Sequence, residues 1–242
     1  MIEPILDRRF IFDSYACRRG KGSHAAIQRC YGFAKRYRFV LRGDVRKFFP
    51  SIDHAVLLTN LSGHFKDKKL LELLQIIVGH PFPGQQPAKW LAGDDLFSII
   101  GKRAGLPIGN QTSQLFGNVM LDSLDQFVKR RLGQKAWVRY ADDFLLFGNC
   151  RRQLSEMKLK IREFLLQQRL ELHHQKTVVD RVCDGFPYLG FRISPRQIKL
   201  GKPAVKRFRR RLQQLEHQYW TCLLYTSPSP RDRTRSRMPS SA

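Results

Sequence analysis

Two adjacent aspartates, Asp142 and Asp143, lie between two short segments rich in residues that favour β-strands, Trp137–Tyr140 and Phe144–Phe147. This layout predicts a tight hairpin that carries both acids at its turn. Neighbouring carboxylates repel each other, and divalent cations would relieve that repulsion, so the pair predicts a metal site suited to phosphoryl transfer. The alternative is a solvated turn, which is our interpretation of Asp94-Asp95 in its Gly- and Pro-rich surroundings.

Asp44 is the candidate for a third carboxylate. It ends an apolar segment, residues 38–44, that predicts a short buried strand. If this strand is a neighbour of the hairpin, Asp44, Asp142 and Asp143 could together hold two Mg²⁺ ions, with Mn²⁺ as a substitute. One ion would lower the pKa of an attacking 3′-hydroxyl, and the other would stabilise a leaving pyrophosphate. Taken alone, Asp44 would more often be a turn residue at the end of a strand.

The spacing of apolar residues predicts the elements that must position these acids. Asp53 and Asp67 are typical N-caps, and Pro203 suits a first helical position. A strand, helices, a hairpin, a helix and further strands, in this order, indicate an α+β fold. The predicted elements are helices at 54–63, 68–78 (with Leu70, Leu71, Leu74 and Ile77 on one inner face), 112–133, 151–169 and 203–219, short strands within 177–200, and mostly loop at 80–104.

The chain is strongly basic. Its 242 residues include 44 Lys and Arg against 20 Asp and Glu, a formal net charge of +24. Such an excess attracts polyanions, and nucleic acid is the first candidate, ahead of an anionic membrane. No stretch is apolar enough to span a membrane, and no signal peptide opens the chain. The five cysteines have no metal-binding spacing, which predicts reduced thiols in a cytoplasmic protein.

The last segment, residues 222–242, differs in character from the rest. Ser, Pro and Arg dominate it, it has no apolar period, and it holds four Arg and one Asp, so most of the positive charge lies before it. We predict that it is disordered. It also resembles the conceptual translation of a sequencing adapter, so we leave it out of the fold prediction. On this interpretation the natural protein continues past Thr221 and the chain is a fragment.

From about residue 8 to about residue 215 the chain resembles the reverse transcriptases. Five segments appear in the order of that family's palm motifs. They are Phe39–His54, Gly105–Asn118, Tyr140–Asp143, Gln175–Thr177 and Tyr188–Gly190.

Within this family the chain is most similar to the reverse transcriptases of diversity-generating retroelements. Ile108-Gly109 and Ser113-Gln114 stand where intron and retron enzymes usually show Gln-Gly and Ser-Pro, and the run Ser14–His24 is similar to that subgroup as well. A Gln at position 108 could hydrogen-bond near the nascent base pair and penalise mismatches, whereas Ile108 only packs. We therefore expect low fidelity, especially opposite template adenines; the alternative is that Ile108 is a plain core residue.

The resemblance implies a right-hand polymerase. Residues 1–36 would be partial fingers, 37–200 a palm with finger insertions, and 201–221 the start of a truncated helical thumb. Basic residues of that last helix would lie near the backbone of a nucleic-acid duplex, namely Lys206, Arg207, Arg209, Arg210 and Arg211.

The resemblance also implies catalytic roles. Asp44, Asp142 and Asp143 would bind the metal ions, with the Val45 carbonyl assisting. Lys176 would protonate the leaving pyrophosphate, although a surface lysine is the alternative.

Other residues would contact nucleotide and primer. Phe49 would exclude a 2′-hydroxyl, Arg18 and Lys21 would reach the triphosphate, and Ile108-Gly109 would border the nucleotide. The turn at Tyr188, Leu189 and Gly190 would grip the primer end. A core aromatic residue, solvated cations and an ordinary β-hairpin are the structural alternatives.

Taken together, these expectations describe an RNA-directed DNA polymerase that copies a template RNA into error-prone cDNA. Its partners would be the template RNA, the primer–cDNA duplex, dNTPs and a small basic accessory protein. The alternatives are an intron- or retron-type reverse transcriptase of ordinary fidelity, and a catalytically idle RNA-binding protein on the same scaffold.

Overall fold

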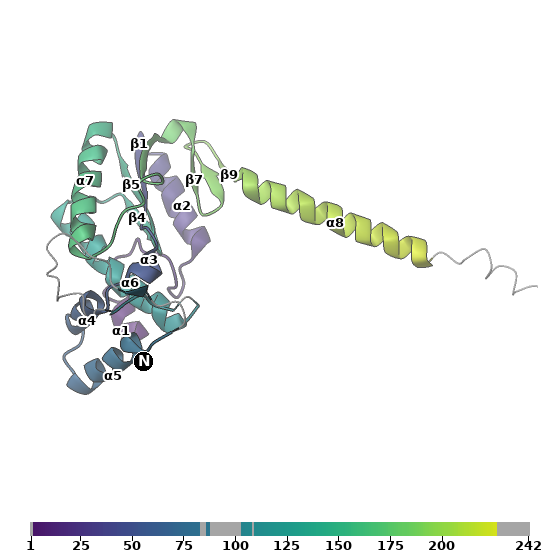
Figure 1. The fold of residues 1–242 in the computed structure, drawn as a ribbon. Coiled ribbons are helices and arrows are strands. Elements are labelled where there is room, and N and C mark those ends of the chain that lie inside the picture. Colours follow the sequence, from purple (N-terminus) through teal and green to yellow (C-terminus); the bar gives the residue numbers. More distant parts are fainter. Residues whose placement is uncertain (1, 83–85, 88–102, 108, 227–242) are drawn as a thin grey trace, which may run out of the picture.

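The computed structural model describes residues 2–82, 86–87, 103–107 and 109–226, with side chains omitted at 86–87 and 222–226 (Figure 1). Most of the predicted 80–104 loop therefore lies outside the described residues, as do Asp94-Asp95, Ile108 and positions 227–242. The predicted combination of helices with antiparallel sheets is confirmed. A long C-terminal helix extends away from the rest of the described chain (Figure 1).

The main sheet has four antiparallel strands in the order β4-β5-β1-β6. Strand β1 (Phe39–Asp44) is central, between β5 (Asp143–Gly148) and β6 (Val178–Arg181), and β4 (Trp137–Tyr140) pairs with β5. The sheet thus brings the predicted hairpin beside a strand that precedes it by about a hundred residues.

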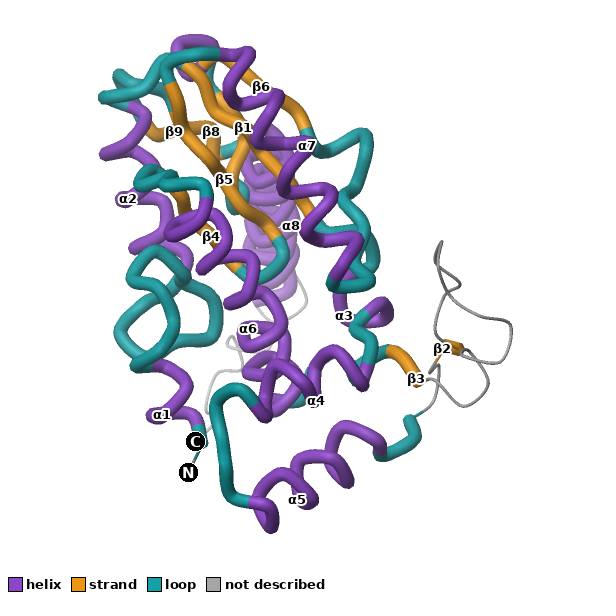
Figure 2. Tube along the Cα trace, turned by 90° about the vertical axis from the view of Figure 1, so that its left-hand side faces the viewer, coloured by secondary structure: helices purple, strands orange, loops and turns teal. Residues whose placement is uncertain are grey.

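Both faces of this sheet are covered, which explains the uninterrupted apolar runs 39–41 in β1 and 144–147 in β5. Along β5, Phe144 and Leu146 pack into one hydrophobic cluster, while Leu145 and Phe147 pack into another. Helices α6 (Gln111–Gln126) and α7 (Arg151–Gln167) contribute to the first cluster, and α2 (Ser23–Ala34) to the second. Helix α7 runs along the strands in both views (Figures 1 and 2). Alternate residues of one strand thus anchor opposite layers.

A helical region lies at one end of the sheet (Figure 2). Both predicted N-caps are confirmed, because Asp53 accepts from the backbone amides of α4 (His54–Ser62) and Asp67 does so for α5 (Lys68–Gly79). The predicted inner position of Ile77 is wrong, since its side chain is 40% exposed. The buried pair on α5 is Leu74 and Val78, one turn apart, so the face is rotated away from Ile77. The short helices of this region are α1 (Glu3–Asp7) and α3 (Phe48–Ser51).

The strands predicted within 177–200 are confirmed. After β6, a 3₁₀ turn (Val182–Asp184) leads to a three-stranded antiparallel sheet. Its strands are β7 (Phe186–Tyr188), β8 (Phe191–Ile193) and β9 (Ile198–Leu200). Two further short strands, β2 (Gln86–Pro87) and β3 (Arg103–Ala104), pair with each other, and a π-helical segment (Phe127–Arg131) extends α6.

Helix α8 (Lys202–Thr226) is longer than predicted. Its first five residues past Thr221 are helical, so the prediction of a disordered segment starting at Cys222 is wrong for 222–226. A helix that is already nucleated extends by further residues at little cost in free energy. The local sequence includes two leucines, which favour a helix. Within the described part of the chain no helix meets the requirements of a membrane span, and Cys17, Cys30, Cys150 and Cys183 are free thiols, as predicted.

Candidate active site

The three predicted carboxylates meet where β1 ends and β5 begins. Asp44 is the direct partner of Asp143 in the β1–β5 pairing, and Asp143 also pairs with Tyr140 across the hairpin. Ala141 and Asp142 form the turn, and Ala141 has a φ of 52°, in the left-handed region. The predicted adjacency of Asp44 to the hairpin is therefore confirmed.

The close approach of the acids alters their protonation. Burial, followed by the nearby Asp44, raises the pKa of Asp142 above its usual value. Desolvation by surrounding protein atoms, and then the charges of Asp142 and Asp44, raises the pKa of Asp143 to about 6. Each shift shows that the negatively charged form is disfavoured in the absence of a cation.

Lys176 supplies the nearest positive charge. Its Nζ donates to Asp44 Oδ2 at 2.5 Å, although the lysine side chain is 62% exposed. The hydrogen bond to Asp44 is the main reason why the pKa of Lys176 is raised. Sequence reasoning placed Lys176 with the acids, and this adjacency is confirmed; its role as a proton donor stays a prediction.

The site is an open pocket of about 250 Å³. Gly43 is required beside it, because a Cβ at this position would lie 2.1 Å from the Phe144 ring. On the other side of Asp44, Val45 is buried and forms an antiparallel bridge with Leu172, and the amide of His173 donates to the Asp44 carbonyl. These contacts fix the backbone on both sides of the acid.

The donor set fits a hard divalent cation, since it consists of carboxylate oxygens whose mutual repulsion Lys176 relieves only in part. Within the described ranges no three His, Cys, Asp or Glu side chains already surround a common point. The ammonium of Lys176 holds one Asp44 oxygen, so a cation that used this oxygen would have to displace it. The metal role of the Val45 carbonyl stays a prediction.

Phe49 packs against helix α6. It is half-buried, with its ring centroid 5.2 Å from that of Phe48. A Cβ at Gly117 of α6 would lie 3.4 Å from the Phe49 ring, so this glycine lets the helix approach. The Leu106 amide donates to the Phe49 carbonyl at 2.9 Å. Gly109, which follows, is exposed with a φ of 103°.

The structure does not bring Arg18 and Lys21 to the acids. Arg18 donates to Asp7 and to the carbonyls of Ile11 and Ser14, and its side chain is only 7% exposed. Lys21 donates to the Phe12 carbonyl at 2.7 Å and lies 3.5 Å from the Phe12 ring centroid. Both cations serve the local fold here, and their contacts with a triphosphate stay predictions.

The predicted primer grip is a turn between β7 and β8. Leu189 and Gly190 have φ values of 46° and 83°, and the Gly190 carbonyl accepts from the Gly201 amide just before α8. Tyr188 points into the core beside α2, and its hydroxyl has no hydrogen-bond partner among the described residues. Burial raises the pKa of Tyr188 well above its usual value. The turn is confirmed, while a grip on a primer stays a prediction.

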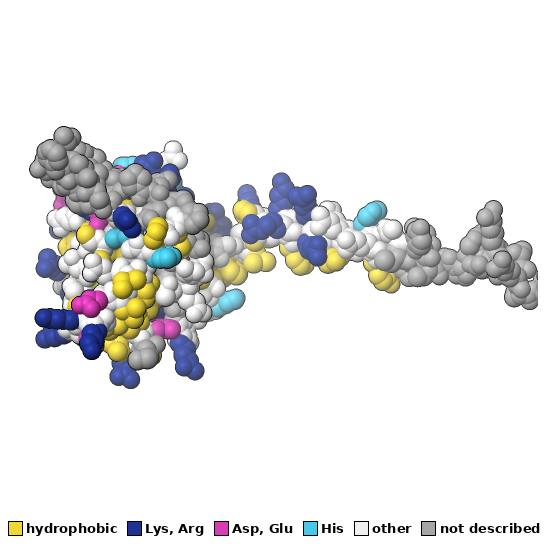
Figure 3. All heavy atoms as spheres, turned by 60° about the horizontal axis from the view of Figure 1, so that its bottom comes forward, with side chains coloured by type: hydrophobic (Ala, Val, Ile, Leu, Met, Phe, Trp, Pro, Cys, Tyr) yellow, Lys and Arg dark blue, Asp and Glu magenta, His cyan; other side chains and the backbone are white. Residues whose placement is uncertain are grey.

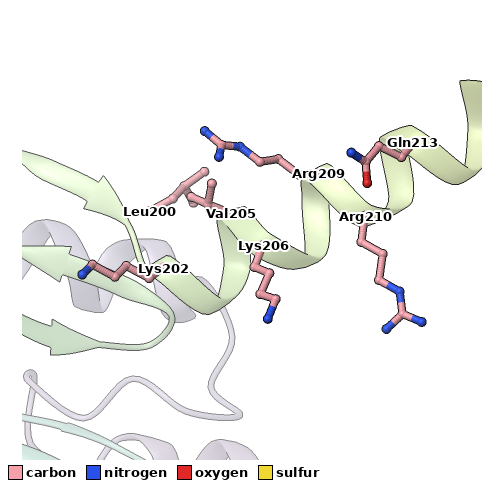
Figure 4. Close-up of a pocket in the computed structure, with 7 residues that line it drawn as sticks. All are labelled: Leu200, Lys202, Val205, Lys206, Arg209, Arg210 and Gln213. Carbon is pink, nitrogen blue, oxygen red and sulfur yellow. The ribbon is translucent and has the colours of Figure 1, made fainter.

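Helix α8 presents its basic residues to solvent. At its start, Lys206 and Arg210 point to one side of the helix, and Arg209 points to the side of Leu200 and Val205 (Figure 4). Over the first half of the helix, Lys and Arg side chains lie mostly on one side and apolar side chains mostly on the other (Figure 3). The predicted cluster is exposed in full: Lys206, Arg207, Arg209, Arg210 and Arg211.

Sequence reasoning missed one buried ion pair next to the acids. Arg139 of β4 and Asp125 of α6 are both 0% exposed, and their side chains lie 2.8 Å apart. The signal was present, because Arg139 interrupts an apolar strand and a buried charge needs a partner. Nothing in the local pattern identified Asp125 as that partner.

Comparison with known proteins agrees with this geometry. Residues 1–193 match the family model described as reverse transcriptase (RNA-dependent DNA polymerase). The chain belongs to the reverse transcriptase family. The predicted family is therefore confirmed, and the diversity-generating subgroup stays a prediction.

Individual relatives of the chain are distant in sequence. The chain is 27% identical over 244 residues to Protein YkfC of Escherichia coli K12, covering 84% of this chain and 61% of that protein. It is 25% identical over 129 residues to an uncharacterized 91 kDa protein in the cob intron of Schizosaccharomyces pombe, covering 53% of this chain and 15% of that protein. The chain thus spans less than two thirds of either relative.

Solved telomerase structures share the fold. One from Candida albicans, in complex with a fragment of telomeric RNA, superposes with a TM-score of 0.57 at 14% identity, covering 81% of this chain and 35% of that one. The apo telomerase of Candida tropicalis truncated from its C-terminal domain gives a TM-score of 0.56 at 15% identity, covering 78% of this chain and 41% of that one. At these identities the likeness concerns the fold alone.

The crowded acids predict that a divalent cation stabilises this reverse transcriptase. At pH 8 and a hundredfold excess over its dissociation constant, Mn²⁺ should raise the melting temperature by roughly 5 °C or more. At pH 5 the rise should be smaller, because the pKa of Asp143 is about 6 and a protonated acid is a poor ligand. The metal-free fold, conversely, loses stability as the pH rises through this value.

Two variants test the location of this effect by differential scanning fluorimetry. Asp142→Asn should remove most of the Mn²⁺-dependent rise, whereas Asp184→Asn, an exposed acid in the 3₁₀ turn, should keep it. Equal rises in both variants would place the cation elsewhere.

Proposed function

We propose that this chain is the catalytic part of an RNA-directed DNA polymerase that copies a template RNA into cDNA. The observation that carries this proposal is the meeting of Asp44, Asp142 and Asp143 at the ends of neighbouring strands. The pKa values of Asp142 and Asp143 are raised, and a bound cation would relieve the unfavourable burial and crowding of their charges. The three acids would hold two Mg²⁺ ions. Such ions, when bound, activate a 3′-hydroxyl and stabilise the leaving pyrophosphate.

Lys176 would act at the leaving-group side of this site. Its side chain is long and mostly exposed, and it is anchored only at its tip by Asp44. A lysine ammonium is protonated at neutral pH, and its hydrogen bond to Asp44 places a proton close to the acids. The same bond raises the pKa of Lys176, so the ammonium becomes a stronger acid once it leaves Asp44. Phe49, held by the Leu106 amide, would border the sugar and exclude a 2′-hydroxyl.

The surrounding elements would correspond to the palm, fingers and thumb of a right-hand polymerase. The four-stranded sheet with α6 and α7 would form the palm, the helical region would form part of the fingers, and α8 would begin the thumb. The exposed basic side of α8 suits contact with the phosphates of a template–primer duplex. The fold likeness to a telomerase solved with RNA supports RNA as the template.

Asp142→Asn separates a polymerase from an idle RNA-binding protein. Loss of one metal ligand removes several kcal/mol of transition-state stabilisation, so primer extension on an RNA template should fall by roughly a thousandfold or more. RNA binding, measured by filter retention, should stay within about twofold, because the basic surface is unchanged.

The matched control is Asp184→Asn, which removes an equal charge away from the pocket and should extend primers normally. The polymerase proposal fails if the unmodified chain binds RNA but extends no primer under any divalent cation. It also fails if Asp142→Asn extends as well as the unmodified chain.

We further propose that this polymerase has low fidelity, as in diversity-generating retroelements. Ile108 lies outside the described residues, but the segment before it is tied to the segment that carries Phe49, since the Gly105 and Leu106 amides donate to the Ile52 and Phe49 carbonyls. A side chain at position 108 would thus follow a segment fixed beside the proposed sugar gate. An aliphatic residue there offers no hydrogen bond with which to penalise a mispair.

Ile108→Gln should lower misincorporation opposite template adenines by roughly tenfold, the value of one well-placed hydrogen bond. The measurement is sequencing of cDNA made from a defined RNA. Ile108→Leu keeps an aliphatic side chain and should retain the original error rate. If the Gln variant errs as often as the unmodified chain, ordinary base selection is the better account.

A further inference from the structure

We propose that Arg139 is the positioning residue of the acid site, because it fixes the turn that carries Asp142 and joins this turn to α6 and to the N-terminal segment. The inference rests on the proposed function, since it concerns the same metal site. It goes beyond that proposal by assigning a role to a buried residue that would touch neither the metal ions nor the substrate.

The guanidinium of Arg139 is held first by Asp125. Nε lies 3.0 and 2.9 Å from the two carboxylate oxygens, and Nη2 lies 2.8 Å from the second. The indole Nε1 of Trp137 donates to the same carboxylate at 2.7 Å. The plane of the guanidinium is therefore fixed, and this leaves Nη1 aimed in one direction.

Nη1 points toward the turn formed by Ala141 and Asp142. It donates to the Ala141 carbonyl at 3.0 Å, and to Asn118 Oδ1 at the same distance. Ala141 has a φ of 52°, a conformation that non-glycine residues rarely adopt without support. The direction of its carbonyl sets the plane of the peptide bond that leads into Asp142, because this bond is planar. Arg139 thus restrains the backbone from which the Asp142 carboxylate projects.

The same residues connect the turn to the N-terminal segment. The Arg139 amide donates to the Asp13 carbonyl at 2.9 Å, and the Arg139 carbonyl accepts from the Tyr15 amide at 3.0 Å. Asn118 closes the link, since its side-chain amide donates to the Ala16 carbonyl at 2.9 Å. One buried arginine therefore contacts the turn, the helix and the segment that carries Arg18 and Lys21.

A lysine could not replace this arginine. Only the planar fork of a guanidinium can bind a carboxylate through one edge and donate to two further oxygens from its other end. A buried ion pair is not in itself evidence for stability, because removing two charges from water offsets most of their attraction. The bond to the Ala141 carbonyl is the part of this network that bears directly on the acid site.

The test measures metal affinity, a readout that a purely structural role would not change. Arg139→Met removes the restraint on Ala141 and should weaken Mn²⁺ binding by roughly tenfold or more, as is typical when a residue that orients metal ligands is lost. Binding is followed on the full chain by the electron paramagnetic resonance signal of free Mn²⁺. Because this variant leaves Asp125 buried without a counter-charge, it will also melt at a lower temperature.

Two further variants separate positioning from stability. The double variant Arg139→Met/Asp125→Asn removes both charges and keeps an acceptor for Trp137, so it should recover much of the melting temperature but none of the Mn²⁺ affinity. Trp137→Phe breaks the bond on the far side of Asp125 and keeps an aromatic ring against Phe144, so it should lower the melting temperature and leave the Mn²⁺ affinity within about twofold.

The inference is overturned if the double variant binds Mn²⁺ as tightly as the unmodified chain, or if Trp137→Phe loses as much affinity as Arg139→Met. Primer extension is not needed for this test. A chain that binds Mn²⁺ in this pattern without extending a primer would refute the proposed polymerase and uphold the role of Arg139.

Discussion

The mutual repulsion of Asp44, Asp142 and Asp143 is the constraint on which the rest of the structure depends. Burial, and then the charges of the neighbouring acids, raise the pKa of Asp142 and of Asp143, so the ionised acids oppose folding and the surrounding chain has to hold them together. The β1–β5 pairing does so directly, because it places Asp44 opposite Asp143. Crowded acids with perturbed pKa values destabilise the folded state, and such groups are typical of functional sites.

Packing on both faces of the sheet stabilises it against the repulsion between these acids. Residues that alternate along β5 enter two hydrophobic clusters, so β1 and β5 are clamped between α2 on one side and α6 with α7 on the other. Gly43 and Phe144 then bring the two strands together at the acid end, where a larger residue at position 43 would collide with the ring. Lys176, from outside the sheet, partly offsets the negative charge.

Local patterns in the sequence were sufficient to predict the hairpin, the strand that ends at Asp44 and the helix caps at Asp53 and Asp67. Each of these depends on neighbours within a few residues, which a periodic pattern records. Predictions that depend on distant partners were weaker. The rotation of α5 that exposes Ile77 is set by the packing of Leu74 and Val78, and the length of α8 by helix propagation.

For the site too, residues that belong to local motifs were predicted, and tertiary contacts were not. The acids and Lys176 were found from residue type and motif order. The engagement of Arg18 by Asp7, the burial of Tyr188 and the pairing of Arg139 with Asp125 were not, because each needs a tertiary contact that sequence spacing does not encode. Buried charges are the most useful of these omissions, since a charge within an apolar strand signals a partner even when it does not identify one.

The central claim is that the three carboxylates form one cation site, in which a cation takes the Asp44 oxygen now held by Lys176 and displaces that ammonium. Anomalous diffraction from crystals of this chain grown with Mn²⁺ tests it most directly. The account predicts a Mn²⁺ peak within about 2.5 Å of carboxylate oxygens from Asp44 and from the Asp142-Asp143 turn, with Lys176 moved off Asp44. A structure in which Lys176 keeps its bond to Asp44 while Mn²⁺ binds elsewhere would contradict it.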